Sequence, residues 1–153
     1  MSDFKRPSIT SGVSYRDPKA ALTWLEQAFG FEPMMVVVNE DGTIGHSEMR
    51  FGDSMIFVGH EYDAKHKSPA SLDGVNTQSL HLQVDSGLDA LFERAKKAGA
   101  KVLREPADQF YGERSAMVAD PEGHTWSFGQ VIKAMSFDEM AKAGGHQEIR
   151  ERL

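Results

Sequence analysis

The stretch from Asp120 to Trp126 reads DPEGHTW, and it decides how the second half of the chain is organised. Asp, Pro, Glu and Gly in this order are typical of a tight turn, because Pro fixes one backbone angle and Gly accepts a positive one. From His124 to Gln130 apolar and polar residues alternate, as they do in a half-buried strand. Arg114–Ala119 has the composition of the strand that precedes the turn.

Followed back from the turn, the second half reads as β-α-β-β-β. Ser79–Val84 alternates apolar and polar residues and is expected to be a strand. A helix is expected next, with Asp85 or Ser86 as its N-cap and Gly99 just past its end. Lys101–Arg104 is the strand expected between that helix and the turn. The apolar stripe of the helix consists of Leu88, Leu91, Phe92 and Ala95.

The first half repeats this order of elements with different residues. Ile9–Tyr15 alternates like a strand, and Asp17 followed by Pro18 is a helix start that Gly30 would end. The three further strands are expected at Met34–Val38, Ile44–Phe51 and Met55–Val58. The sequence therefore predicts two β-α-β-β-β modules.

Residues 1–135 are expected to form one domain, with modules at about 7–62 and 77–131 and a polar stretch between them. Residues 136–153 are expected to form a helical tail, because Ser136 and Glu139 have the spacing of a capping box. A chain of 153 residues and 17.0 kDa fits a single core of ordinary size.

Composition excludes several classes of function. The net charge of −6 gives no attraction to nucleic acid or to an anionic membrane surface. There is no cysteine, which removes thiolate chemistry and Cys-ligated metals and fits a reducing compartment. No apolar run is long enough to span a membrane, and the first residues do not read as a secretory signal. We therefore expect a cytoplasmic protein.

The tandem module order, the DPEGHTW turn and the string QFYGER from Gln109 to Arg114 resemble the vicinal oxygen chelate superfamily, the glyoxalase/bleomycin-resistance/dioxygenase group. The resemblance covers roughly residues 7–131. It implies an α+β fold in which tandem βαβββ modules form two curled mixed β-sheets around a cavity, with helices on the convex faces. It also implies a homodimer.

Metal-dependent members of this superfamily place His, Gln or Glu on the cavity face of the first and last strand of each module. The positions that correspond in this sequence are Thr10, Phe57, Ser79 and Ser127. Hydroxyl groups and a phenyl ring do not replace the imidazole or carboxylate donors that divalent metals need. We therefore expect no metal and no other cofactor there. His81 lies two residues beyond Ser79 on the same face of its strand, so a shift of register by two residues would put an imidazole at that position.

Strand alternation also selects the residues expected to contact a ligand. His46, Glu48 and Arg50 share one face of their strand, where Glu48 is a candidate base with the other two as partners. The alternative is a solvated ion pair. Aromatic residues are expected as apolar walls. The predicted ligand-binding residues are His46, Glu48, Arg50, Phe57, His81, Phe110, Tyr111 and Ser127.

Three functions remain open at this point. The leading one is metal-independent binding of a small organic molecule in the concave cavity, either to sequester a drug or for chemistry not yet assigned. The second is a glyoxalase-like lyase or isomerase with a displaced divalent metal site made by His46, Glu48 and His81. The third is a non-catalytic interaction module whose cavity is filled by Phe57 and Met55.

Overall fold

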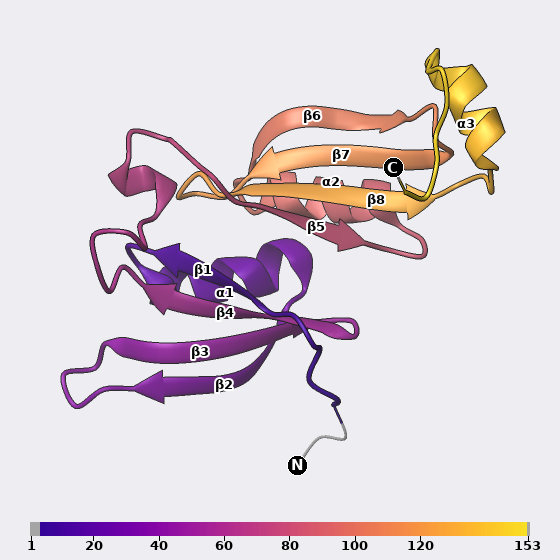
Figure 1. Ribbon diagram of the computed structural model, residues 1–153. Coiled ribbons are helices and arrows are strands. Elements are labelled where there is room, and N and C mark those ends of the chain that lie inside the picture. The colour runs from indigo at the N-terminus through magenta and orange to yellow at the C-terminus, as the bar shows by residue number, and fades with distance from the viewer. Residues whose placement is uncertain (1–3, 153) are drawn as a thin grey trace.

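The computed structural model describes residues 4–152 and contains two four-stranded sheets (Figure 1). The strands of the first sheet are β1 (Ser11–Tyr15), β2 (Glu32–Val38), β3 (Ile44–Phe51) and β4 (Ser54–His60). Those of the second are β5 (Ser79–Gln83), β6 (Lys101–Asp108), β7 (Glu113–Ala119) and β8 (Thr125–Val131). The spatial orders β1-β4-β3-β2 and β5-β8-β7-β6 are the same for both modules. The predicted tandem βαβββ order is confirmed.

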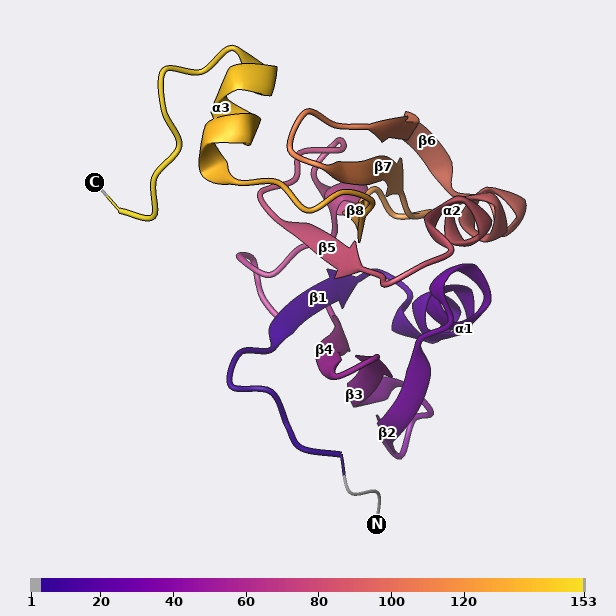
Figure 2. The same cartoon turned by 90° about the vertical axis from the view of Figure 1, so that its right-hand side faces the viewer.

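Both sheets are mixed, because β1 runs parallel to β4 and β5 runs parallel to β8, while the other pairs are antiparallel. The helices are α1 (Pro18–Phe29), α2 (Leu88–Lys97) and α3 (Phe137–Gly144), and a short 3-10 turn lies in the linker at Pro69–Ser71. Figure 2 shows α1 and α2 next to each other on one side of the sheets, at the right of the view, and α3 on the other side. None of the helices in residues 4–152 is long and apolar enough to cross a bilayer.

Helix α1 begins and ends as predicted, but α2 begins differently. The side chain of Asp17 accepts a hydrogen bond from the backbone of Ala20, and Gly30 ends α1 in the left-handed conformation. The N-cap of α2 is Gly87, at φ 78°, so neither predicted cap residue is used. The first amide of α2 donates instead to the side chain of Gln130 on β8, at 3.0 Å. A tertiary contact has replaced the local cap.

Strand β6 is longer than predicted, since it continues through Pro106 to Asp108. Pro removes a backbone donor and usually ends a strand, but it is tolerated on an edge strand. β6 is the edge of its sheet, and its register to β7 shifts between Arg104 and Ala107. The proline therefore lies in a bulge where no ladder hydrogen bond is lost.

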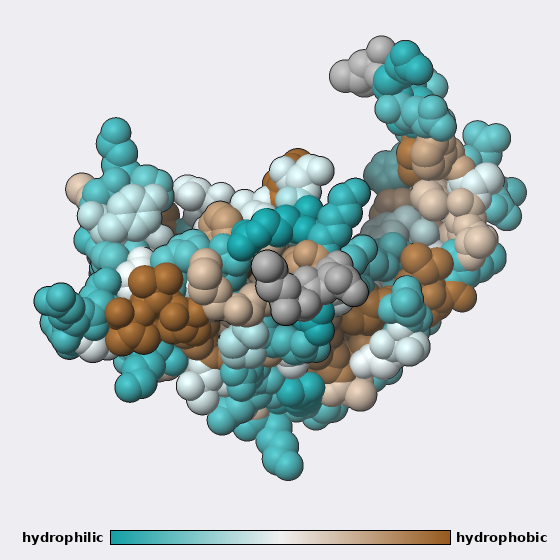
Figure 3. Space-filling view, turned by 90° about the horizontal axis from the view of Figure 1, so that it is seen from below, coloured by the Kyte–Doolittle hydropathy of each residue, from teal (hydrophilic) through white to brown (hydrophobic). Residues whose placement is uncertain are grey.

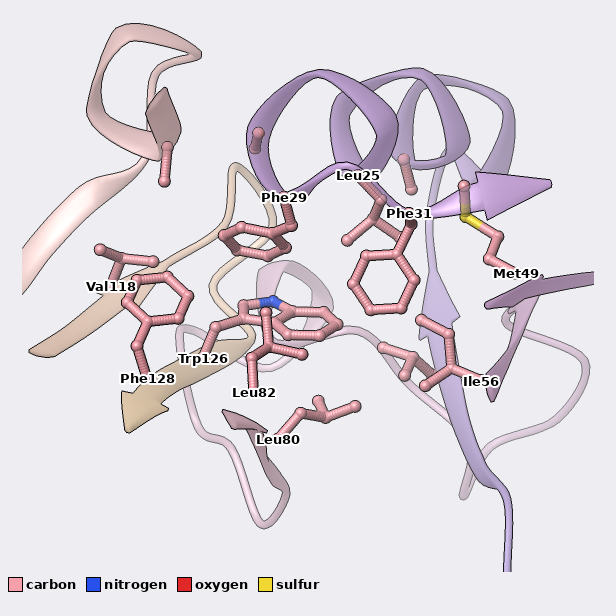
Figure 4. Packing of buried hydrophobic residues seen from close by; sticks show 14 of the residues in the cluster. Leu25, Phe29, Phe31, Met49, Ile56, Leu80, Leu82, Val118, Trp126 and Phe128 are labelled. Atoms are coloured by element: carbon pink, nitrogen blue, oxygen red, sulfur yellow. The ribbon is translucent and has the colours of Figure 1, made fainter. Parts of the chain in front are cut away.

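The hydrophobic core takes residues from both modules. Trp126 and Phe128 of β8 are fully buried, and Trp126 lies among Phe29, Phe31 and Leu82 (Figure 4). The ring centroid of Phe29 is 5.0 Å from that of Trp126, in the tilted geometry that aromatic pairs favour. Because this cluster joins α1 to the second sheet, it fixes the two modules against each other.

The DPEGHTW turn forms a polar joint between the modules. The buried carboxylate of Asp120 accepts hydrogen bonds from the Tyr15 hydroxyl at 2.7 Å and from the Trp126 indole at 3.1 Å. Burial, with the negative charge of Asp120, raises the pKa of Tyr15 well above its ordinary value. Glu122 of the same turn accepts from the backbone amides of Arg16 and Asp17. The turn between β7 and β8 of the second module is therefore also hydrogen-bonded to the end of β1 and the start of α1 in the first module.

Candidate functional site

The side of the sheets away from α1 and α2 is open. All eight strands face the reader in Figure 1 with these two helices behind them, and Figure 3 shows a hollow between the body and the projecting C-terminal segment. Leu80 and Leu82 are 8% and 6% exposed and point into the core, while His81 between them is exposed. The alternation expected for β5 therefore holds, and its polar residues lie on the open face.

On the second sheet, a chain of four polar side chains crosses three strands. Ser127 of β8 and His81 of β5 are paired in the parallel ladder, and Ser127 Oγ lies 2.8 Å from His81 Nδ1. His81 Nε2 lies 2.9 Å from Gln83 Oε1, and Gln83 Nε2 donates to Glu113 Oε1 at 3.4 Å. Gly129 makes room for this chain, because a Cβ there would lie 2.7 Å from Gln83 Oε1.

The carboxylate of Glu113 sets the direction of every bond in this chain. A carboxylate only accepts, so the amide nitrogen of Gln83 faces it and the amide oxygen faces His81. His81 then donates from Nε2, and the Ser127 hydroxyl, which also reaches the Leu80 carbonyl oxygen at 3.4 Å, lies beside Nδ1. The imidazole is thereby held in one orientation on the open face.

On the first sheet, the polar cluster is charged. Glu48 on β3 is 4% exposed, and its two carboxylate oxygens accept from the Arg6 guanidinium at 2.7 and 3.0 Å. His46 Nε2 lies 3.3 Å from the same carboxylate, and the His46 ring packs edge-on against Phe57 at 5.0 Å. The hydrogen bonds from Arg6 are the largest cause that lowers the pKa of Glu48, and burial opposes them.

The expected pairing of Glu48 with Arg50 does not occur. Arg50 donates instead to Glu32 on the neighbouring strand β2, at 2.6 and 2.9 Å, and lies 5.8 Å from the ring of Phe4. The β2–β3 register places Glu32 directly opposite Arg50, so this cross-strand pair is the nearer partner. Glu48 and Arg50 thus belong to two separate ion pairs.

The four positions at which the family resemblance implies metal ligands carry no imidazole or carboxylate, since they are Thr10, Phe57, Ser79 and Ser127. The Phe57 ring packs on His46, and the Ser127 hydroxyl lies beside His81 Nδ1. The displaced site of His46, Glu48 and His81 does not form, since the first two lie on one sheet and His81 on the other. Across residues 4–152 the structure brings no three His, Asp or Glu side chains together for a metal ion.

A groove of about 410 Å³ opens between the two sheets, and we refer to it as the seam groove. Its apolar wall is made by Phe31, Phe51, Ile56, Leu80, Leu82 and Trp126, which come from both modules. Its polar residues include Asp53, Ser54, His81 and Gln83. Met55 lines the groove and also lies 4.0 Å from the Arg6 guanidinium, so the groove reaches the charged cluster.

Phe110 and Tyr111 lie away from this groove, in the loop between β6 and β7. Their rings are 5.2 Å apart, and Phe110 also packs against His146 at 5.1 Å. A side chain at Gly144 of α3 would collide with the Phe110 ring. The pair therefore contacts the C-terminal helix, and neither residue lines the seam groove.

Three members of the polar clusters were not among the predicted ligand-binding residues. Gln83 lies two positions from His81 on the same face of β5. Glu113 follows the same alternation as Ser115 on β7, so extending the count to that strand would have found it. Arg6 lies before β1, 42 positions from Glu48, and no periodic pattern predicts that contact.

Comparison with known proteins identifies the family. The model of the Glyoxalase/Bleomycin resistance protein/Dioxygenase superfamily matches residues 9–128. The uncharacterized protein Mb0911c of Mycobacterium bovis is 31% identical over 145 residues, covering 92% of this chain and 94% of that protein.

Solved structures share the fold. TioX from Micromonospora sp. ML1 superposes with a TM-score of 0.66 and 28% identity over 82% of this chain and 98% of TioX. TnmS3, an antibiotic binding protein from Streptomyces sp. CB03234, superposes with a TM-score of 0.62 and 21% sequence identity, and the match covers 83% of this chain and 98% of TnmS3. With a family model that spans most of its length and strands in the family's tandem order, this chain belongs to the glyoxalase/bleomycin resistance protein/dioxygenase superfamily.

Proposed function

We propose that this protein binds a small organic molecule in the seam groove and on the open face beside it, without metal ligands at the family positions. The groove carries this proposal, because its volume of about 410 Å³ lies within the range of ligand sites and its wall is apolar with a few polar groups. His81 is the polar group that we expect to orient the ligand, since Gln83 and Glu113 hold its imidazole in one orientation.

Two observations support a binding role over the alternatives. A vestigial interaction module would have an interior filled by Phe57 and Met55, but the groove is open and Phe57 packs on His46 outside it. The fold is shared with TnmS3, which is named as an antibiotic binding protein, and that likeness concerns the fold alone. Sequestration of a drug-like compound is the form of binding that we propose first.

The proposal is tested by a thermal-shift screen of aldehydes, glutathione conjugates and planar drugs. A ligand that binds only the folded state raises Tm by mass action. At a hundredfold excess of ligand over Kd, the free energy of unfolding increases by about 2.7 kcal/mol. We expect His81→Ala to weaken the response to a hit while leaving the ligand-free Tm nearly unchanged, because His81 lies on the exposed face. A screen without any hit, or an unchanged response in His81→Ala, would count against the proposed site.

A second candidate function is proton transfer at His81. The chain Ser127–His81–Gln83–Glu113 has the order of nucleophile, base and orienting group that activates a hydroxyl. The Ser127 hydroxyl would give its proton to His81 as its oxygen attacks the acyl carbon of an ester; the acyl C–O bond then breaks, and the departing alcohol takes that proton from His81. Mass spectrometry after incubation with an activated ester tests this: acylation at Ser127 that is lost in His81→Ala supports it, and an unmodified Ser127 rules it out.

We also propose that two copies of the chain pair through exposed apolar edges. Met35, Val36, Val37 and Val38 on the edge strand β2 are each at least 41% exposed, and Figure 3 shows hydrophobic side chains gathered at that edge. An unpaired apolar edge strand is a template for association. Light scattering is expected to give twice the 17.0 kDa chain mass, and Val37→Lys is expected to reduce it. A wild-type monomer would contradict the pairing.

A further inference from the structure

Glu48 is a buried carboxylate on a strand face that it shares with His46 and Arg50. It is 4% exposed, and in the β3–β4 ladder it stands opposite Phe57, while Met55 stands opposite Arg50, two residues along β3. A carboxylate removed from water needs a charged or hydrogen-bonding partner, since burying it alone is costly. Something must therefore supply a cation at this position.

That cation comes from outside the two sheets. Arg6 belongs to the segment that precedes β1, which has no helix or strand from Phe4 to Thr10. Figures 1 and 2 show this segment on the open side, opposite α1. The Arg6 side chain is 60% exposed although its guanidinium bonds both oxygens of Glu48. The exposed Arg6 side chain can therefore be exchanged for another cation from solution, whereas leaving the buried Glu48 carboxylate unpaired would be costly.

We propose that Glu48 anchors a subsite for an organic cation, which Arg6 occupies in the free protein. The charged group that fits is a planar amidinium or guanidinium, because Glu48 already accepts two parallel N–H bonds of that geometry. An aromatic or apolar body attached to it would lie on Phe57 and Met55 and continue into the seam groove, which Met55 also lines. The inference rests on the proposed function, since it names the ligand class for the same open face.

The other charges nearby favour a cation over an anion. Arg50, two residues along β3, is neutralised by Glu32, so it offers no free positive charge to an anionic ligand. His46 already donates to Glu48 and would remain beside the incoming cation. Displacing Arg6 with another cation keeps the buried carboxylate paired, whereas an anion would leave two negative groups in contact.

Calorimetric titration with benzamidine tests the subsite, with benzamide as a neutral ligand of the same shape. We expect Arg6→Ala to bind benzamidine about tenfold more tightly than the wild type, because the competing side chain is gone. Lys5→Ala removes the same charge from the adjacent residue and is expected to behave like the wild type. Arg6→Ala with Glu48→Gln should lose the gain, and benzamide should not distinguish any of these variants.

A second variant, Glu48→Asp, keeps the test valid if Glu48→Gln does not fold. Glu48→Asp keeps the charge but withdraws it by one methylene, so in the Arg6→Ala background it should weaken benzamidine binding without removing it. Equal binding of benzamidine by Arg6→Ala and the wild type, or a gain that survives Glu48→Gln, would overturn the cation subsite. Benzamidine binding that depends on His81 but is the same in Glu48→Gln would overturn the cation subsite too, while leaving the proposed function intact.

Discussion

The open faces of the two sheets occupy equivalent places in the fold but differ in chemistry. On the first sheet the buried carboxylate of Glu48 depends on Arg6, which reaches it from outside the sheet. On the second, His81 is held by Gln83 and Ser127, both from within the sheet. Two sheets of the same topology therefore carry different clusters. The Glu48 cluster loses its partner when the segment that carries Arg6 moves, whereas the His81 cluster is held by residues of its own sheet.

The largest effect on Tm is expected from removing Asp120, whose carboxylate links the two modules through Tyr15 and Trp126. Asp120→Ala leaves the buried Tyr15 hydroxyl and Trp126 indole without their acceptor. Orphaned buried donors cost about 3 kcal/mol together, which lowers Tm by roughly 10 °C in a domain of this size. Calorimetry measures the change. Asp85→Ala, at an exposed residue that caps no helix, is the control and should be almost silent. Equal Tm values for the two variants would show that the joint does not hold the modules.

A smaller effect is expected from adding one methyl group to each open face. A Cβ at Gly129 would lie 2.7 Å from Gln83 Oε1 and 2.8 Å from His81 Nε2, whereas Gly59 on β4 has open space there. Overpacking typically costs about 1–3 kcal/mol, so Gly129→Ala should lower Tm and Gly59→Ala should not. Chemical denaturation of both variants measures the difference. If both variants have the same stability, the second face is no more rigid than the first.

The Glu48 ion pair on the first face should make the stability of the fold depend on pH. The pKa of Glu48 is lowered in the folded protein, first by the hydrogen bonds from Arg6. Its ionised form therefore stabilises the fold above the unfolded pKa, and this contribution is lost as pH falls through the lowered folded value. Glu48→Gln should thus lower Tm at neutral pH and have no effect in acid.

The same comparison can be made at increasing salt concentration, with Ser127→Ala as the control variant. Added salt should reduce the effect of Glu48→Gln and leave that of Ser127→Ala unchanged, because no charge is removed at Ser127. A Glu48→Gln effect that is the same at every pH and salt concentration would contradict the ion pair with Arg6.

The smallest effect is expected at the β6–β7 loop. Tyr111 packs with Phe110, which contacts the C-terminal segment, and neither lines the seam groove. Tyr111→Ala should therefore leave the affinity for a groove ligand unchanged in calorimetric titration, while His81→Ala lowers it. A loss of affinity in Tyr111→Ala would extend the binding surface to that loop, as the sequence alone suggested.

Much of the fold follows from local patterns in the sequence. The alternation of Leu80 and Leu82 with polar neighbours predicts which face of β5 is buried, and Asp17 with Pro18 predicts the start of α1. These features depend on residues close in the sequence, so they survive in the folded chain. The β6 prediction stopped too early because Pro106 breaks a strand except at an edge, and edge position is set by the whole sheet.

The candidate site was less predictable, because its contacts are long-range. Strand periodicity puts His81 on the open face, but its pairing with Ser127 depends on the β5–β8 register. The partner of Glu48 comes from an irregular segment, where no periodicity exists to be read. The alternation of apolar and polar residues along a strand predicts which side chains lie on the open face. The hydrogen-bond partners of those side chains depend on strand register and on segments outside the sheets.

Binding of a small organic molecule in the seam groove can be observed by chemical-shift mapping of the isotopically labelled protein. During titration with a hit from the thermal-shift screen, we expect the shifted amides to cluster at β5 and at the β3–β4 turn, around His81 and Met55. Shifts confined to the β6–β7 loop and α3, or spread evenly over the chain, would contradict it.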